Sequence, residues 1–196
     1  MSITINGNGT ITGYTPATVA DGGITAPKLA SGVGGKILQA QNTTVTAIST
    51  VSANSSWEDT SITCSITPSS TNSKILINLT VSGEGNSSNQ RNFTHRMKKV
   101  VGGTTSYIQG ATVSNRVSHL GSTGDLTNDA STTASSFSVT GLLDENITST
   151  DAITYTLQMT YASASGGGTY YINRNVADQS GSPRFLSWIT LLELSS

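Results

Sequence analysis

The chain has 196 residues, of which 35% are hydrophobic and only 11% are charged, and its formal net charge is −1. This length allows one ordinary domain with a small appendage. A nearly neutral chain lacks the clustered positive field that phosphate binding needs, which argues against nucleic acid as the main partner. The abundance of Ser, Thr, Ile and Val favours an all-β protein with a hydroxyl-covered exterior over a disordered chain.

Residues 1–20 form a polar leader that contains the pattern SITINGNGTITG. In it Ile3, Ile5 and Ile11 alternate with polar residues, and two Asn-Gly pairs supply turn chemistry. A hairpin this small is not stable alone in water, so we expect these three isoleucines to pack on the body of the same chain, on another copy of the leader or, as particle attachment, on a larger particle. The start resembles no secretory signal, and no apolar run suits membrane insertion.

Residues 21–35 follow as a neck, DGGITAPKLASGVGG, with two Gly-Gly pairs and one Pro. The segment is too short and too polar to be a domain. Its GVGGKI run lacks the spacing of a phosphate-binding loop and precedes a strand pattern, not a helix. We interpret the segment as a neck that joins the leader to a globular body. If the protein forms a trimer, we expect three copies of the neck to wrap one another, each placing Ile24 and Leu29 on a shared axis.

Residues 36–196 contain the strand patterns of a globular domain. The predicted strands are Lys36–Ala47, Ser61–Thr67, Lys74–Ser82, Asn92–Val101, Thr104–Gln109, Ser135–Leu143, Ala152–Tyr161, Thr169–Arg174 and Phe185–Leu194. Gly102-Gly103 predicts a two-residue hairpin. Gly83–Gln90 and Ala162–Gly168 are predicted loops, and Gly110–Thr133 has room for one short irregular strand. A set of about eight short strands with turn signals between them and one apolar face each predicts a jelly-roll-like β-sandwich.

The last predicted strand is apolar on both faces, unlike the others. Trp188, Leu192 and Leu194 alternate on one side, while Ile189 and Leu191 lie on the other. A strand that is apolar on both faces is buried on both faces. We therefore predict that Ile189 and Leu191 form an interface with another subunit.

No pattern in the sequence indicates catalysis, a cofactor or a metal. His95 and His119 have no second ligand at a metal-binding spacing, and Asp125 with Asp129 matches no calcium loop. Cys64 alternates with apolar residues and is predicted to be a core thiol. The one basic cluster is interpreted as a solvated strand face: Arg91, Arg96, Lys98 and Lys99.

Several motifs together resemble the short tail-fibre-like virion proteins of bacteriophages, especially phages of cyanobacteria and other aquatic bacteria. The N-terminal ones are SITINGNGTITG, DGGITAPKLASG and GGKILQ. Those of the body are SITPSSTNSKILI (Ser65–Ile77), ITYTLQ (Ile153–Gln158), TYYINR (Thr169–Arg174) and LSWITLLEL (Leu186–Leu194). The resemblance covers both ends and the middle of the chain.

The resemblance implies a non-enzymatic homotrimer of the phage particle, made in the host cytoplasm. Its N-terminus would bind other virion proteins of the tail or capsid, and its β domain would point outward, where it could contact a host-surface glycan. Two alternatives remain open: a capsid decoration protein, and a free carbohydrate-binding module. For the second, the aromatic candidates are Trp57, Tyr107, Tyr170 and Tyr171, most of which are expected to cap the core.

Overall fold

The computed structural model describes residues 36–53, 56–86, 93–111, 118–123, 134–161 and 167–195, and the backbone of two short strands nearer the N-terminus. Contacts divide the chain into two units, Met1–Lys36 and Ile37–Ser196. The second unit contains the strands predicted for the globular domain.

In the N-terminal unit the backbone forms the hairpin that the leader predicts. Strand β1 (Thr4–Ile5) pairs antiparallel with β2 (Ile11–Thr12), and Ile5 lies opposite Ile11. The side chains of this hairpin are outside the described residues, so particle attachment through them stays a prediction. Three further contact residues lie wholly outside the described part: Ile3, Ile24 and Leu29.

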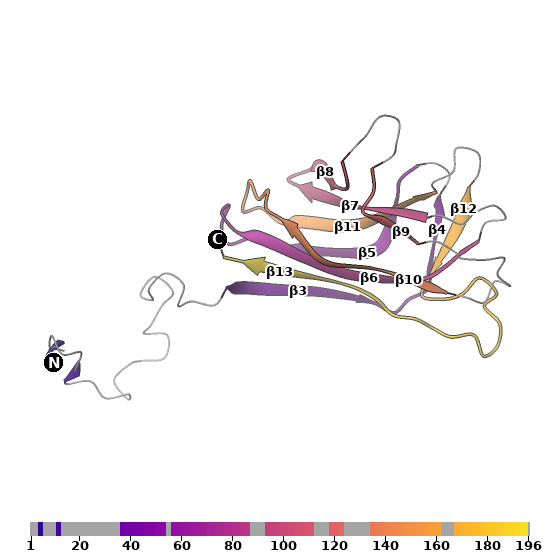
Figure 1. The fold of residues 1–196 in the computed structure, drawn as a ribbon, viewed down its shortest axis with the longest axis horizontal. Coiled ribbons are helices and arrows are strands. Elements are labelled where there is room, and N and C mark those ends of the chain that lie inside the picture. The colour runs from indigo at the N-terminus through magenta and orange to yellow at the C-terminus, as the bar shows by residue number, and fades with distance from the viewer. Residues whose placement is uncertain are drawn as a thin grey trace. The chain divides into compact units, whose positions relative to one another are not determined.

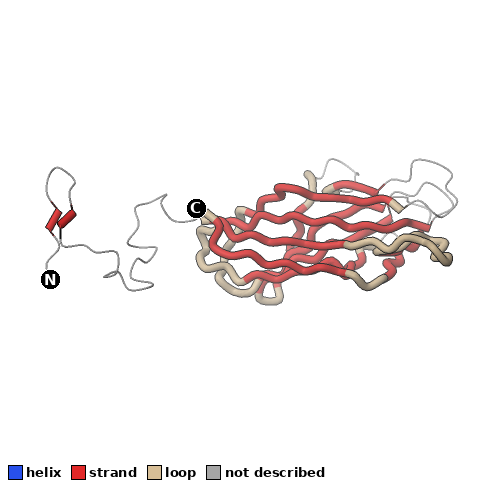
Figure 2. Tube along the Cα trace, turned by 90° about the horizontal axis from the view of Figure 1, so that it is seen from below, coloured by secondary structure: helices blue, strands red, loops and turns tan. Residues whose placement is uncertain are grey.

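The second unit is built from two antiparallel sheets (Figure 1). The strands are β3 (Ile37–Val45), β4 (Ser49–Ala53), β5 (Glu58–Ile66), β6 (Lys74–Asn86), β7 (Phe93–Val101), β8 (Thr104–Ile108), β9 (Gly121–Thr123), β10 (Ser135–Asp144), β11 (Ile153–Tyr161), β12 (Gly168–Ile172) and β13 (Ser187–Leu194). The first sheet has the order β3-β13-β6-β12-β4, with β10 also on β6, and the second has β5-β11-β7-β8, with β9 also on β7. Figure 2 shows the long strands running side by side.

In three places two strands that follow each other in the chain lie end to end along the same side of a neighbour. β12 and β13 pair with successive parts of β6. β4 and β3 pair with β12 and β13 in turn, and β8 and β9 pair with successive parts of β7. Joining these three pairs reduces the eleven strands to eight long ones. The first then pairs with the eighth, the second with the seventh, the third with the sixth and the fourth with the fifth. This nested pairing gives two four-stranded layers and confirms the predicted jelly-roll-like sandwich.

Apolar side chains that alternate along the strands fill the space between the sheets. Ile62, Cys64 and Ile66 of β5 face inward as predicted, and Cys64 is an unpaired buried thiol. The first sheet contributes Ile75, Ile77, Leu79 and Val81 of β6, and the second contributes Ile153, Tyr155, Leu157, Met159 and Tyr161 of β11. Period-two alternation thus identified the core faces of the long strands.

Two glycines in β6 correct the predicted loop at Gly83–Gln90. The strand continues to Asn86, and a Cβ on Gly83 would lie 2.0 Å from the carbonyl oxygen of Tyr171. A Cβ on Gly85 would lie 2.2 Å from the ring of Phe93. These glycines allow close approach within the sheet and core, whereas sequence reasoning treated them as strand breakers. By contrast, Gly102 and Gly103 have φ of 53° and 82° and form the predicted hairpin turn.

A buried asparagine hydrogen-bonds to both breaks in the first sheet, the one between β3 and β4 and the one between β12 and β13. Asn173 follows β12, has φ of 64°, and exposes none of its surface. Its Nδ2 donates to the carbonyl oxygens of Val45 (2.7 Å) and Ala47 (3.0 Å), between β3 and β4. Its Oδ1 accepts from the hydroxyl of Ser187, at the start of β13, at 2.6 Å. The sequence did not predict β4, because only Val51 and Ala53 mark its inner face.

The last strand, β13, corrects the predicted subunit interface. Ile189 and Leu191 face the core of a single chain and expose none of their surface, so neither side chain is available to another subunit. Trp188, Leu192 and Leu194 instead face outward and are half-buried. Sequence reasoning placed Ile189 and Leu191 on the outer side, but they share the inward face with the polar residues Ser187 and Glu193.

Candidate functional site

The histidines and acids of the described residues do not gather into a metal site. No group of three His, Cys, Asp or Glu side chains there could hold a metal ion. His95 lies in the core, stacks on Phe137 at 4.2 Å and places Nε2 3.2 Å from the hydroxyl of Thr123. Burial, with a smaller effect from His119, lowers the pKa of His95 to about 3, so its ring is neutral at physiological pH. Asp125 and Asp129 lie outside the described residues.

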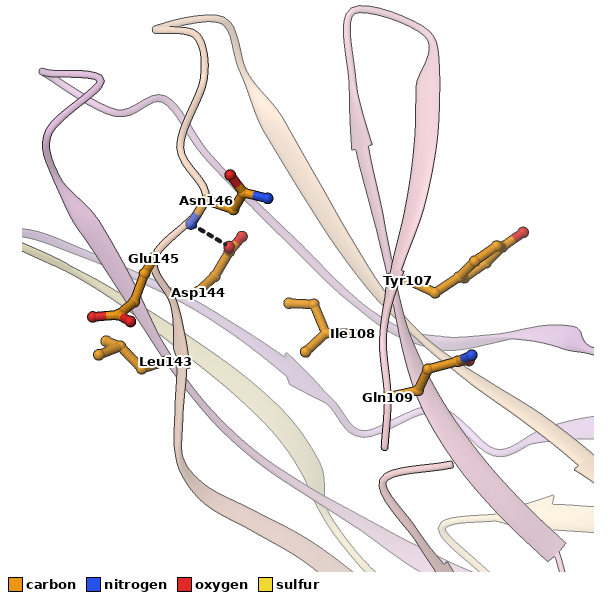
Figure 3. A pocket seen from close by; sticks show the side chains of 7 residues that line it. All are labelled: Tyr107, Ile108, Gln109, Leu143, Asp144, Glu145 and Asn146. Atoms are coloured by element: carbon orange, nitrogen blue, oxygen red, sulfur yellow. Dashed lines mark hydrogen bonds between the residues drawn. The ribbon is translucent and has the colours of Figure 1, made fainter. Parts of the chain in front are cut away.

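An open cleft of about 460 Å³ lies between the ends of β8 and β10 (Figure 3). Its lining residues are Tyr107, Ile108, Gln109, Leu143, Asp144, Glu145 and Asn146. In Figure 3 the ring of Tyr107 points away from β10, whereas Ile108 points toward it. The side chains of Tyr107 and Ile108 therefore leave β8 in different directions at this cleft.

The buried one of the two carboxylates that line this cleft already has its hydrogen-bond partners. Asp144 lies 2.7 Å from the ammonium of Lys99 and accepts from the hydroxyl of Tyr155 at 2.6 Å and the amide of Asn146 at 3.0 Å. Lys99 also donates to the carbonyl oxygen of Asn146 at 2.6 Å. Burial, and then Asp144, raise the pKa of Tyr155, which keeps this hydroxyl protonated. The network holds β7, β10 and β11 together, and Lys99 is buried where a solvated position was predicted.

A second buried carboxylate explains two motifs of the resemblance. Oε1 of Glu193 accepts from the amide (2.7 Å) and hydroxyl (2.6 Å) of Ser69 and from the hydroxyl of Ser73 (2.6 Å). Its Oε2 accepts from Gln39 at 2.6 Å. Burial alone would raise the pKa of Glu193, but these hydrogen bonds outweigh burial and lower it to about 2. LSWITLLEL and SITPSSTNSKILI thus meet at a structural carboxylate.

The outer face of the first sheet carries a row of apolar side chains that crosses its four neighbouring strands β3, β13, β6 and β10, with one side chain from each. Leu192 lies opposite both Ala40 and Leu76, and Leu76 lies opposite Leu143. We call these four residues the apolar row. Leu143 is 39% exposed, and the nearby Leu38 is 47% exposed.

Next to the apolar row the same face is polar but uncharged. The outward side chains there are Asn42, Thr44, Asn78, Thr80, Ser138 and Thr190, with Trp188 among them. The charged Lys74–Glu145 pair lies at the margin of this face. Charges are depleted and apolar side chains gathered in this way at the centres of protein interfaces.

The outer face of the second sheet has the opposite character. The guanidinium carbon of Arg96 lies 3.6 Å from the ring centroid of Tyr107 and 4.3 Å from that of Trp57. Tyr107 is 45% exposed. The stack therefore offers an aromatic ring to solvent beside a fixed cation.

A chain of polar contacts fixes this stack to the sheet. Nε of Arg96 donates to Gln158 at 2.7 Å, and Gln158 donates to Asp59 at 2.6 Å. Lys98 lies 2.7 Å from the other oxygen of Asp59. Burial raises the pKa of Asp59, but the hydrogen bonds from Lys98 and Gln158 outweigh it, so the pKa is lowered. We call the whole set the Arg96 cluster: Trp57, Asp59, Arg96, Lys98, Tyr107 and Gln158.

Strand register brings the Arg96 cluster together. Gln158 of β11 lies opposite Arg96 of β7 and Asp59 of β5, and Lys98 lies opposite Tyr107. Sequence analysis named its aromatic and basic members separately, but no local spacing joined them. Of the other aromatic candidates, Tyr170 packs in the core at 5.3 Å from Phe93, and Tyr171 lies under Arg174 at 4.0 Å. Arg91 lies outside the described residues.

No family model and no curated protein matches this chain. In the part that the structure describes, no helix has the length and apolar character needed to cross a membrane.

Proposed function

We propose that this protein is a non-enzymatic structural protein of a bacteriophage particle, of the tail-fibre-like kind, and that it assembles as a homotrimer through the outer face of its first sheet. The observation that carries the proposal is the apolar row on a face whose central positions bear no charge. The resemblance of the leader, neck and body motifs supports two parts of the proposal, that the protein belongs to a phage particle and that it is a homotrimer.

The apolar row favours self-association on energetic grounds. Leu76 and Leu192 are partly exposed and Leu143 is 39% exposed, and each gains roughly 1 kcal/mol or less when another surface covers it. A closed cyclic assembly covers the same face once in every subunit, so no copy is left exposed. Hydroxyl and amide side chains next to the row can hydrogen-bond across such an interface without the cost of desolvating a charge.

The strand directions give the body two distinct ends. β3 begins at Ile37, directly after the N-terminal unit. Strands β4, β6, β9 and β11 all end at the opposite end of the sandwich from Ile37, because successive long strands alternate in direction. If the protein is held by its N-terminus, we propose that this end of the sandwich is the one that meets the host surface.

The mass in solution, measured by light scattering at several concentrations, tests the assembly. We expect three chain masses for the wild type and one for the double variant L76T/L192T. The matched control is Val100→Thr, on the outer face of the second sheet, which should leave the mass unchanged. A wild-type monomer at all concentrations would contradict the proposal, as would a trimer that the double variant leaves intact.

Copy number in purified particles separates the two particle roles. A fibre of the tail is present in few copies, whereas a decoration protein occupies the symmetry axes of the shell in many. Deleting residues 1–35 should abolish incorporation in either role, and a truncated protein that still joins particles would contradict attachment through the leader.

A free carbohydrate-binding module is the second candidate, and the Arg96 cluster is the observation that favours it. Such a module would bind saccharides with the leader deleted and would be absent from particles.

A further inference from the structure

We propose that the Arg96 cluster on the outer face of the second sheet is a binding site for saccharides with pyranose rings. This inference deepens the host-contact part of the proposed function and rests on it for its biological setting, although the binding itself requires only the folded chain.

The exposed ring of Tyr107 supplies the stacking surface. One face of this ring is covered by the guanidinium of Arg96 at 3.6 Å, yet 45% of the residue is exposed. A pyranose ring presents a patch of C–H groups, which packs on an aromatic face, and a rim of hydroxyls, which needs hydrogen-bonding groups nearby. The ring centroid of Trp57 lies 4.3 Å from the same guanidinium carbon, so a second aromatic ring contacts Arg96.

Polar groups with remaining capacity surround this aromatic surface. Asp59 keeps 49% of its side chain exposed while both oxygens accept hydrogen bonds, and a carboxylate has further lone pairs to offer. Lys98 is 25% exposed, and it has donors beyond its contact with Asp59. The site therefore combines an aromatic face with acceptors and donors for sugar hydroxyls.

The cluster is held in place before any ligand arrives. Gln158 is only 6% exposed and bridges Arg96 to Asp59 through contacts of 2.7 and 2.6 Å. Side chains fixed in this way lose little conformational entropy on binding, so even a small site can retain useful affinity. All members of the cluster except Trp57 also lie on strands, which hold a site more precisely than loops do.

Its place in the fold leaves the cluster open in the proposed assembly. The cluster lies near the middle of its strands, where Arg96 is opposite Gln158 and Lys98 is opposite Thr156. It also belongs to the second sheet, so the proposed subunit contact on the first sheet leaves it uncovered.

The purified full chain would be applied to an array of bacterial surface oligosaccharides, and the strongest binder then titrated by calorimetry. We expect Tyr107→Ala to weaken binding at least about tenfold, a factor that corresponds to roughly 1.4 kcal/mol. Arg96→Gln should weaken it similarly, because it removes the cation that fixes the ring. The matched control is Tyr171→Ala, which removes a tyrosine stacked on an arginine elsewhere, and it should keep affinity within about twofold.

Circular dichroism would confirm that each variant is folded. The inference is overturned if no oligosaccharide binds at millimolar concentration, or if folded Tyr107→Ala binds as tightly as the control. Solution mass and particle incorporation of Tyr107→Ala should match the wild type. A failure of saccharide binding is thereby distinguished from a failure of the virion role, which those two readouts test.

Discussion

The outer faces of the two sheets carry opposite chemistry, although they belong to one sandwich and are built from the same kind of alternating strand. The first face has its apolar row flanked by hydroxyl and amide side chains, while the second carries two cations, a carboxylate and two aromatic rings in contact. In a chain with only 11% charged residues, this segregation is informative. Charges are costly under a covering surface and inexpensive in water, so their placement indicates which face is covered.

Two faces of such different chemistry require that each strand keeps one side toward the core and the other toward solvent. Two adjacent lysines of β7, one on each side, test this orientation. Lys99 points inward to Asp144, so Lys99→Met leaves a buried carboxylate without its cation and should cost about 3–5 kcal/mol of unfolding free energy. Lys98→Met, on the outward face, should cost less than about 1 kcal/mol. Urea denaturation of both variants gives the comparison. Equal losses would mean that β7 does not separate an inner from an outer face as described.

Acid titration of stability tests the carboxylate that joins β13 to the turn before β6. The folded-state pKa of Glu193 is about 2, below its ordinary value of 4.5, so its stabilisation is complete above about pH 4.5. It should be lost as the pH falls from 4.5 toward 2, because the unfolded chain takes up the proton first. Glu193→Gln should cost about 2 kcal/mol at pH 7 and flatten the stability profile in this window.

The control for that titration is Glu145→Gln, at the exposed margin. It should change stability by less than about 0.5 kcal/mol. If Glu193→Gln retained the wild-type loss of stability between pH 4.5 and 2, other carboxylates would be responsible for it.

A charge placed in the apolar row should directly weaken the association of subunits through the first face. Leu143→Lys puts the same cation in all three copies of the proposed interface and should weaken association by about tenfold or more, with little effect on the fold. Thr105→Lys, on the exposed outer side of β8, should leave association unchanged. Sedimentation velocity across a concentration series measures both, and equal association of the two variants would remove the first face as the interface.

The smallest effect is expected at the exposed ion pair of the Arg96 cluster. Asp59→Asn should lower stability by less than about 1 kcal/mol, since Asp59 and Lys98 are partly solvated. The thermal midpoint difference from wild type should shrink further in high salt, which screens the pair. A larger, salt-independent loss would mean that the cluster supports the fold itself and is not chiefly a surface site.

Alternation along single strands was sufficient to predict the all-β class and most strands. Ile62, Cys64 and Ile66 face the core as their spacing predicts, and Gly102-Gly103 forms its hairpin, because both signals are local to the backbone. The short β9 also falls inside the segment where one irregular strand was expected. The leader hairpin is paired at Ile5 and Ile11 for the same local reason.

Only the tertiary structure decided which side of β13 is buried and which residues form the Arg96 cluster. Ile189 and Leu191 face inward because the polar residues beside them, Ser187 and Glu193, find partners more than a hundred residues away or across the Asn173 turn. Tyr107 meets Arg96 only through strand register. A period of two in the sequence shows that successive side chains point to opposite faces of a strand. Which of the two faces is buried, and which side chains meet across strands, depends on partners that are distant in the sequence.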